Sequence, residues 1–368
     1  MSKKYLYVVT IAPTLRVLMR GQITWMQNKG FEVHTISSGQ IDDQDGESFT
    51  QKHHEVSMTR EISPFRDSLS ALNLARVISN VRPDVIVAST PKAAFLGLLV
   101  ARLLRVPKRV YLLRGLRLAT ERGLKRRILS LMEKITVANC DVVIAVSASV
   151  GAEFSSLGLS PKEKIKFVGA GSSNGVDASR FHPLSPGERE SARTERGITS
   201  GQIVVGFVGR LVADKGFQIY CDALDPICQM NTKVIPMVFG SNEENLEIPE
   251  WMRFMGVQDN LENWYPIFDI LVLPTYREGF PNVVIEAGAC GVPTITTMAT
   301  GSVDSVIDGV TGVLVGVGDV GQTRQAIETL IANPELRTSM GNAARDRTVR
   351  DFNPQDIWQG YLEIYESL

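Results

Sequence analysis

The sequence predicts an α/β protein built from two doubly wound, Rossmann-like domains that face each other across a cleft. Two observations predict this class: apolar, β-rich runs alternate with helical stretches, and the alternation starts again at Ile203 after a polar segment. Strands that are continuously apolar indicate a parallel sheet covered by helices on both faces. The length of 368 residues also exceeds what one hydrophobic core usually serves, which favours two domains.

Five apolar runs in the first half have the composition of buried strands. They are Tyr5–Ile11, Phe31–Ile36, Asp84–Ala88, Arg109–Leu113 and Asp141–Val146. Helices are expected between them, the first ending at Gly30, since glycine suits a helix C-terminus. Further helices are expected near residues 70–80 and 93–104 and in the basic stretch that precedes the fifth strand.

Six runs continue the pattern in the second half. They are Ile203–Val208, Val234–Phe239, Arg253–Met255, Ile270–Leu273, Thr294–Thr296 and Val313–Val315. The segment FHPLSPGERESARTERG, residues 181–197, is polar with two prolines, and we interpret it as a linker. Residues 354–368 carry apolar side chains at helical spacing, so we expect a helix that crosses back to the first domain. The expected domains are residues 1–180 with about 354–368, and residues 181–353.

Several classes of protein are disfavoured by composition. No apolar run reaches the ~20 residues of a membrane span, and the first residues lack the pattern of a signal peptide, so we expect a cytoplasmic protein. The four cysteines and four histidines show no metal-ligand or disulfide spacing. We therefore expect reduced thiols, no metal site and no cofactor.

The overall charge of −1 conceals a basic half and an acidic half. Residues 1–180 contain 26 Lys and Arg against 15 Asp and Glu, a net charge of +11, and the remainder is correspondingly acidic. Ten basic residues lie between Arg102 and Arg127, interleaved with leucines, as on surfaces that rest on anionic lipid. The membrane-facing candidates are Arg117, Arg122, Lys125, Arg126 and Arg127. A solvated basic face over a buried leucine stripe is the alternative, and nucleic acid is disfavoured because aromatic residues for base stacking are lacking.

The stretch ILVLPTYREGFPNVVIEAGA, from Ile270 onward, has the pattern of a strand, a loop and a helix. Ligands of open parallel sheets lie outside the carboxyl ends of the strands, where such loops enter helices. The helix N-terminus favours an anion or sugar hydroxyls, and Glu278 and Glu286 could each accept two hydroxyl protons. The pair could therefore hold the two sugars of one nucleotide sugar. The alternative is that Glu278 caps the helix and Glu286 is solvated on its surface.

The stretch VVGFVGRLVADKGF places Gly209, Arg210 and Lys215 just after a strand. A guanidinium and an ammonium there could neutralise a diphosphate without a metal, although both could also be ordinary surface charges. Two other patterns are weaker. The glycines of FVGAGSSNGVD lack dinucleotide-binding spacing, and Asp43 and Asp45 form a D-x-D in a polar loop that we interpret as solvated.

The sequence resembles glycosyltransferase family 4, whose members are nucleotide-sugar-dependent retaining enzymes of the GT-B fold. Three stretches carry the resemblance: VGRLVADKGF, VLPTYREGFPNVVIEAGACGVPTI and NGVDASRFHP. The E-x7-E spacing of Glu278 and Glu286 is a signature of that family. The stretch STPKAAFLGLLVARLLRVPKRVYLLRGLR looks like the amino half of its bacterial polysaccharide and lipid-linked oligosaccharide members.

The resemblance implies roles for residues of the second half. Arg210 and Lys215 would bind the donor diphosphate, Glu286 the ribose, and Glu278 the donor sugar. The remaining positions implied for the donor are Gly209, which precedes Arg210; Gly256 and Val257 near the base; and Gly279, Phe280 and Pro281 near the sugar. Asn282 falls in a position typical of the family. Thr300 and Gly301 also fall in positions typical of the family.

The first half departs from the family pattern on the acceptor side. The stretch that commonly carries a histidine has Lys92, and the later His-Gly pair is replaced by Arg114 and Gly115. The usual glycine-rich loop after the first strand offers only Gly21, and we expect Arg16 or Arg20 to supply the charge that backbone amides supply elsewhere. The acceptor-side candidates are therefore Arg16, Arg20, Gly21, Lys92 and Arg114, and phosphates on the acceptor would suit them.

These observations together predict a retaining sugar transferase at the cytoplasmic membrane surface. The donor would be a nucleotide diphosphate sugar, uridine-linked rather than guanosine-linked, and the acceptor a polyprenyl-diphosphate-linked saccharide. Three alternatives remain open at this point: a transferase with a soluble small acceptor, a nucleotide-sugar epimerase of the same fold, and an inactive nucleotide-sugar-binding subunit.

Overall fold

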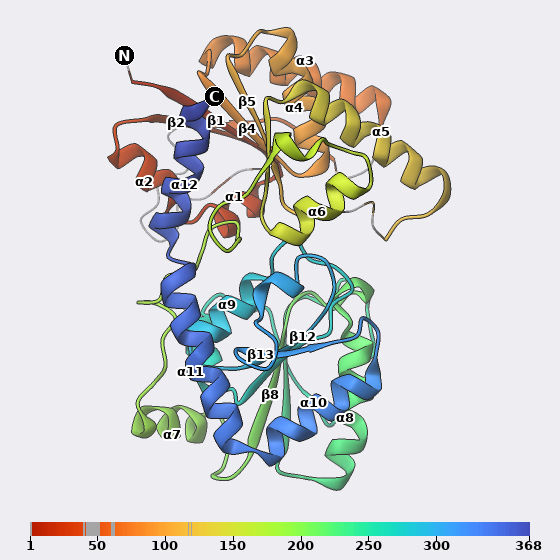
Figure 1. The fold of residues 1–368 in the computed structure, drawn as a ribbon, viewed down its shortest axis with the longest axis vertical. Coiled ribbons are helices and arrows are strands. Elements are labelled where there is room, and N and C mark those ends of the chain that lie inside the picture. Colours follow the sequence, from red (N-terminus) through yellow and green to blue (C-terminus); the bar gives the residue numbers. More distant parts are fainter. Residues whose placement is uncertain (1, 40, 42–51, 60–62, 117, 119) are drawn as a thin grey trace. The chain divides into compact units, whose positions relative to one another are not determined.

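The computed structural model divides the chain into two compact units (Figure 1). It describes residues 2–39, 41, 52–59, 63–116, 118 and 120–368. The first unit comprises Met1–Asn174 with Pro354–Leu368, and the second comprises Gly175–Asn353. Residues 175–180, which we expected in the first domain, belong to the second unit.

The first unit is a parallel sheet with helices on both faces. Its described strands are β1 (Lys4–Ile11), β2 (Glu32–Ser38), β3 (His53–Glu55), β4 (Val85–Ser89), β5 (Lys108–Leu113), β6 (Val142–Ala145) and β7 (Ile165–Lys166). Its described helices are α1 (Ala12–Leu18), α2 (Gln22–Asn28), α3 (Pro64–Val81), α4 (Pro91–Leu103), α5 (Gly123–Asn139), α6 (Ala148–Ser156) and α12 (Pro354–Ser367). The strand order is β3-β2-β1-β4-β5-β6-β7, so the direction of winding reverses between β1 and β4.

The second unit repeats this architecture. Its strands are β8 (Ile203–Val208), β9 (Val234–Phe239), β10 (Arg253–Gly256), β11 (Ile270–Leu273), β12 (Thr294–Thr297) and β13 (Gly312–Val315). Its helices of two turns or more are α7 (Pro186–Glu195), α8 (Phe217–Met230), α9 (Asn282–Ala289), α10 (Val320–Ala332) and α11 (Pro334–Asp351). The strand order is β10-β9-β8-β11-β12-β13, with the reversal between β8 and β11. The predicted doubly wound fold of each half is confirmed.

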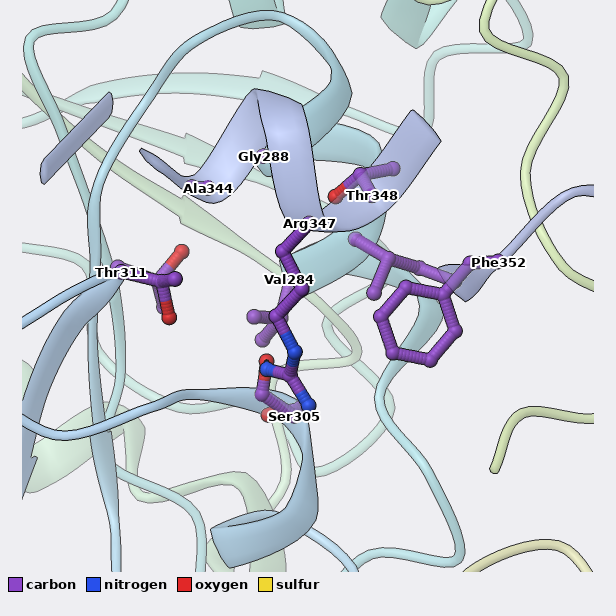
Figure 2. A pocket seen from close by; sticks show the side chains of 10 residues that line it. Val284, Gly288, Ser305, Thr311, Ala344, Arg347, Thr348 and Phe352 are labelled. Carbon is purple, nitrogen blue, oxygen red and sulfur yellow. Dashed lines mark hydrogen bonds between the residues drawn. The ribbon is translucent and has the colours of Figure 1, made fainter. Parts of the chain in front are cut away.

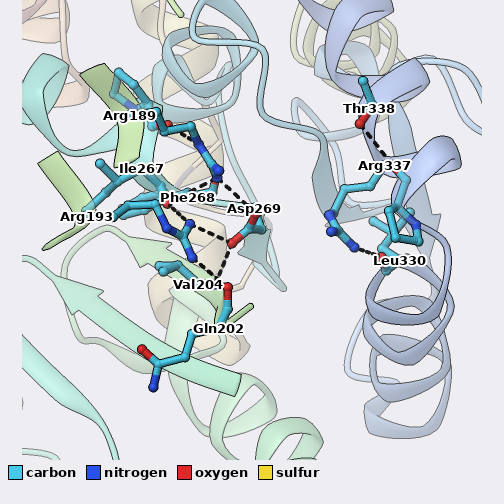
Figure 3. A network of polar contacts seen from close by, with 12 residues as sticks. Arg189, Arg193, Gln202, Val204, Ile267, Phe268, Asp269, Leu330, Arg337 and Thr338 are labelled. Carbon is cyan, nitrogen blue, oxygen red and sulfur yellow. Dashed lines mark hydrogen bonds and ion pairs between the residues drawn. The ribbon is translucent and has the colours of Figure 1, made fainter. Parts of the chain in front are cut away.

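The segment that we interpreted as a linker instead contains helix α7, so this prediction was wrong. The helix begins with a capping box in which Ser185 and Glu188 satisfy each other's backbone amides. Arg189 and Arg193 then pair with Asp269, at 2.9 and 3.0 Å, and Asp269 also accepts the backbone N–H of Val204 at 2.7 Å (Figure 3). This network fixes α7 to the amino ends of β8 and β11, at the opposite edge of the sheet from the loops that follow these two strands.

The basic stretch Arg102–Arg127 crosses several elements, as expected from the predicted helix near 93–104, the strand Arg109–Leu113 and the basic helix after it. It contains the end of α4, strand β5, a loop and the first turn of α5. Leu116 and Leu118 are buried in the core, and Arg109 is buried and paired with Asp141. The exposed basic surface is therefore smaller than the sequence suggested. Arg117, like the Asp43 and Asp45 pair, lies outside the described residues.

A small cavity lies between helices α9 and α11 of the second unit (Figure 2). Its lining includes Val284, Thr294, Thr311, Arg347 and Phe352. It encloses about 10 Å³, which is room for about one water molecule. A nucleotide sugar cannot occupy it, so this cavity is not a substrate site.

Helix α5 carries one buried carboxyl group whose titration should affect stability. Glu133 is 7 % exposed and accepts a hydrogen bond of 2.9 Å from Tyr111. Burial raises the pKa of Glu133 from 4.5 to about 7, and the Tyr111 hydrogen bond only partly opposes this. The folded protein therefore holds a proton that the unfolded chain has lost between these pH values. This contribution to stability is complete below about pH 4.5 and is lost as the pH rises through about 7.

We expect Glu133→Gln to remove this pH dependence. The unfolding free energy of the variant relative to the wild type should rise by about 3 kcal/mol between pH 4.5 and pH 8, since each pKa unit corresponds to about 1.4 kcal/mol. Urea titrations at several pH values measure the difference. Replacing the exposed Glu190 of α7 with Gln provides a control. If the unfolding free energies of the wild type and of Glu133→Gln changed in parallel with pH, the prediction would be contradicted.

Candidate functional site

The loops after β8 and β11 meet where the winding of the second sheet reverses. Ligands of doubly wound sheets bind at this position, outside the carboxyl ends of the strands. The loop after β8 holds Arg210 and ends in a short 3-10 helix, Ala213–Lys215. The loop after β11 holds Glu278 and leads into α9. The two predicted motifs therefore share one edge of the sheet.

Lys215 and Glu278 form an ion pair between these loops. Their side chains are 20 % and 11 % exposed, so the pair is largely removed from solvent. Helix α9 begins without a side-chain cap, which rules out the alternative that Glu278 caps it. A ligand that enters this site must compete with, or add to, a charged pair that already exists.

A second ion pair holds the two loops in register. Asp214, next to Lys215, accepts hydrogen bonds from the Arg277 guanidinium, one of them at 2.9 Å from Nε. The backbone carbonyl of Asp214 accepts from Tyr276 N at 2.9 Å and from the Thr275 hydroxyl at 3.0 Å. Asp214 and Arg277 are thus positioning residues for the charged pair beside them.

At two glycines beside the loop that holds Glu278, neighbouring backbone lies too close for a side chain to fit. Gly216 has φ +71°, and a Cβ there would lie 1.9 Å from the Pro274 carbonyl oxygen. Gly301 has φ +79°, and its Cβ would lie 2.3 Å from the Glu278 carbonyl oxygen. Both positions exclude a side chain by conformation and by space. Glu278 N also donates to the Thr300 carbonyl at 3.0 Å, which fixes the backbone of that loop.

Arg210 lies at the same edge but has a different partner. Its guanidinium contacts Glu243 at 2.8 Å, and both side chains are about half exposed, at 51 % and 43 %. Gly209, just before it, donates its N–H to the Phe239 carbonyl at 2.9 Å. The structure therefore places Arg210 and Lys215 in the same loop after β8 but pairs them with separate carboxylates.

Glu286 is the fifth residue of α9 and is held by a tyrosine. Tyr265, which is fully buried, donates its hydroxyl to Glu286 at 2.8 Å. Burial raises the pKa of Glu286, while the Tyr265 hydrogen bond and the nearby charge of Arg180 lower it. Arg180 itself pairs with Glu262 at 2.9 Å. Glu286 is thus not a solvated surface residue, and its partner Tyr265 belongs to no motif that we could recognise in the sequence.

The other donor-side candidates lie on the same set of loops. Gly256 ends β10 and accepts the Gly240 N–H at 2.8 Å, and Val257 beside it is 66 % exposed. The Phe280 ring is buried against Phe352, so only its backbone can face a ligand. Gly279 and Pro281 flank it at the start of α9.

Asn282, the first residue of α9, has a buried side-chain oxygen that lacks a hydrogen-bond donor among the described residues. Its Oδ1 is buried and accepts no hydrogen bond within the described part of the chain. A buried acceptor without a donor is costly. A ligand hydroxyl at the start of α9 would relieve that cost.

The acceptor-side candidates of the first unit have varied surroundings. Gly21 has φ +75° and lies against the Trp358 ring of α12, which explains this glycine by packing. Lys92 is buried and paired with Asp67 at 2.7 Å. Arg16 lies on α1 and Arg20 lies just after it, and both side chains are exposed. Arg114 directly follows β5.

Neither a membrane span nor a metal cluster is found where the chain is described. Across those residues, every helix falls short of the length and apolar character that a membrane span requires. Among the same residues, His, Cys, Asp and Glu side chains form no group of three or more that could hold a metal ion.

Comparison with known proteins identifies both halves of the chain. Residues 15–171 match the model of a glycosyl transferase 4-like domain, and residues 188–347 match that of the glycosyl transferases group 1. The capsular polysaccharide biosynthesis glycosyltransferase CapM of Staphylococcus aureus is 33% identical, over 100% of this chain and 97% of its own length. An N,N'-diacetylbacillosaminyl-diphospho-undecaprenol alpha-1,3-N-acetylgalactosaminyltransferase of Campylobacter jejuni is 24% identical over 83% of each chain.

Solved structures share the fold. HepE of Anabaena in complex with UDP superimposes with a TM-score of 0.80, at 20% identity and with 100% of both chains covered. WaaG, a glycosyltransferase involved in lipopolysaccharide biosynthesis, gives a TM-score of 0.76 at 16% identity over 99% of each chain. With two parallel-sheet units, two matching family models and a relative similar over its whole length, this chain belongs to glycosyltransferase family 4 and is a glycosyltransferase of the GT-B fold.

Proposed function

We propose that this glycosyltransferase moves a sugar, with retention of configuration, from a uridine diphosphate sugar to a polyprenyl-diphosphate-linked saccharide in polysaccharide biosynthesis. The observation that carries the donor half of the proposal is the ion pair of Lys215 and Glu278 at the β8/β11 reversal. It sets a cation and a hydroxyl acceptor side by side at the edge where a nucleotide diphosphate sugar would lie. The UDP complexes of the structurally similar HepE support a uridine nucleotide.

The proposed roles follow from the chemistry of each group. Lys215 and Arg210 stabilise negative charge on the departing diphosphate, which requires no metal. Glu278 and Asn282 accept hydroxyl protons of the donor sugar. Glu286, oriented by Tyr265, accepts those of the ribose. The acceptor hydroxyl then gives its proton to the leaving phosphate, so that no histidine is needed on the acceptor side.

The acceptor half of the proposal rests on charge and on relatives. The Campylobacter relative is named for an acceptor on diphospho-undecaprenol, and the CapM relative for capsular polysaccharide. In the first unit, Arg122 at the start of α5 and Lys125, Arg126 and Arg127 within it are exposed. The same helix exposes the apolar side chains of Leu124 and Leu131, at 73 % and 60 %. We propose that this surface rests on the anionic inner face of the cytoplasmic membrane, where the acceptor lies.

The donor class can be tested by ligand-induced thermal stabilisation. The purified protein is unfolded in the presence of uridine, guanosine and adenosine diphosphates, with Glu286→Ala alongside. A nucleotide at 100 times its Kd should stabilise the wild type by about 2.7 kcal/mol, and at equal concentrations of the three nucleotides UDP should have the largest effect. Stabilisation by GDP or ADP alone would overturn the uridine assignment. Product analysis with UDP-sugars then separates transfer from epimerisation and from binding without turnover.

Membrane docking should depend on the exposed charges of α5. Replacing Arg122, Lys125, Arg126 and Arg127 with glutamine should reduce co-sedimentation with vesicles that contain anionic lipid, since each charge contributes about 1 kcal/mol near such a surface. Added salt should likewise reduce the co-sedimentation of the wild type, because salt screens these charges. Four glutamines at the exposed Lys162, Lys166, Lys233 and Arg350, none of which lies on α5, serve as the matched control. Co-sedimentation that changes neither with added salt nor on removal of the α5 charges would contradict the docking proposal.

A further inference from the structure

Arg114 lies directly after β5, at the carboxyl edge of the first sheet. The neighbouring strand β4 ends in Ser89 and leads into Thr90, a non-glycine residue with φ +70°. The Thr90 hydroxyl lies 2.6 Å from that of Thr10, at the end of β1. Carboxyl edges of parallel sheets are where ligands bind, and strained residues such as Thr90 often gather at such sites.

Two nitrogen atoms of the Arg114 guanidinium are buried without a counter-charge among the described residues. None of those residues accepts a hydrogen bond from its Nε or Nη1. The phenol groups of Tyr361, Tyr365 and Tyr7 lie near enough to act on its charge, and burial lowers the pKa of Arg114. The hydroxyls of Tyr7 and Tyr365 lie close enough to interact with each other, and neither has another hydrogen-bond partner within the described residues.

Arg109 shows how the same strand satisfies an arginine that has a purely structural role. It is 8 % exposed, and it donates to the Val106 carbonyl at 2.7 Å, to the Asn139 carbonyl at 3.0 Å and to the carboxylate of Asp141. A buried charge without such partners is strongly destabilising. Five residues further along, Arg114 bears that cost among the described residues, and a bound anion would relieve it.

We propose that Arg114, with the hydroxyls of Tyr7 and Tyr365, forms an anion site of the first unit that binds a phosphate or diphosphate group. Arginine suits this ligand because its planar guanidinium donates two parallel hydrogen bonds to phosphate oxygens. The tyrosine hydroxyls supply neutral donors that add no charge. On the proposed function, on which this identification of the ligand rests, the anion is the diphosphate of the lipid-linked acceptor. A free phosphate has the same chemistry.

The proposal predicts opposite effects of one substitution in two conditions. Arg114→Met retains the apolar stem but removes the unpaired charge, so without anions its Tm should equal or exceed that of the wild type. The matched variant Arg109→Met should lower the Tm, because it leaves Asp141 and two carbonyls without their donor. Pyrophosphate at 100 times its Kd should raise the folding equilibrium constant about 100-fold in the parent protein, and not in Arg114→Met.

The thermal titrations are made in the Arg210→Ala, Lys215→Ala background, so that the two donor-side cations do not contribute, with sodium chloride at equal ionic strength as the reference. Farnesyl diphosphate is compared with inorganic pyrophosphate. Tighter, Arg114-dependent binding of the prenyl compound assigns the site to a lipid-linked diphosphate, and equal binding assigns it to a free one. A pyrophosphate response that persists in Arg114→Met, or no response in the parent, overturns the proposal. Loss of UDP stabilisation in proteins that contain Lys215 would instead overturn the proposed donor, without affecting this result.

Discussion

Replacing Lys215 with alanine is expected to lower turnover by about 100-fold or more. Lys215 is the cation nearest to Glu278, and removing one donor that stabilises a leaving group typically costs that much. The effect should lie in kcat rather than in KM, because charge on the diphosphate grows as the sugar departs. Steady-state kinetics with the donor identified by thermal titration measure it. Lys233→Ala, which removes an exposed lysine of the same unit, should retain activity.

A structural effect of Lys215→Ala must be separated from a catalytic one. The substitution leaves Glu278 partly buried without its ion-pair partner, which by itself destabilises the protein. The double variant Lys215→Ala with Glu278→Gln removes that unpaired charge, so it should recover stability without recovering turnover. Arg210→Ala should also lose about 100-fold in turnover, with little loss of stability because its pair with Glu243 is exposed. Full activity in Lys215→Ala would remove the argument for diphosphate stabilisation without a metal.

Replacing Glu286 with alanine is expected to weaken the binding of the free nucleotide by about 10-fold to 100-fold. Hydrogen bonds to a charged group contribute about 1.5 to 3 kcal/mol each, and the substitution removes the carboxylate assigned to the ribose. Isothermal titration with UDP measures the change. Tyr265→Phe removes only the 2.8 Å hydrogen bond that holds the carboxylate, so it should weaken binding less. An unchanged Kd in Glu286→Ala would show that this carboxylate does not contact the nucleotide.

The sequence allowed the fold to be predicted wherever strands are central in the sheets. Runs such as Ile203–Val208 and Ile270–Leu273 are buried on both faces, so they are continuously apolar and could be recognised. Strands β3 and β7 were missed because they are edge strands of three and two residues, too short to show a period. Helix α7 was missed because its composition is polar, although the S-x-x-E pattern at Ser185 and Glu188 could have revealed it.

The candidate site was predictable residue by residue but not as a set of contacts. Glu278 and Lys215 could be named from their motifs, whereas their ion pair depends on β8 and β11 being neighbours, which no local pattern encodes. The same holds for Asp214 and Arg277, which are 63 residues apart. Arg109 and Arg114 look alike in the sequence, and only the packing around β5 shows that one is fully paired and the other is not.

Helix α12 gives the two units different histories during synthesis. The second unit is one continuous segment, Gly175–Asn353, so all of it has been translated before α12 is made. The rest of the first unit is made before the second, whereas Trp358, Tyr361 and Tyr365, all buried in the first unit, are made after it. Because domains fold as units while the chain emerges from the ribosome, the nascent first unit lacks the packing of these three side chains while the second is completed. A chain that stops at residue 353 would thus carry a finished second unit and an unfinished first one, and quality control by chaperones would act on the amino-terminal half.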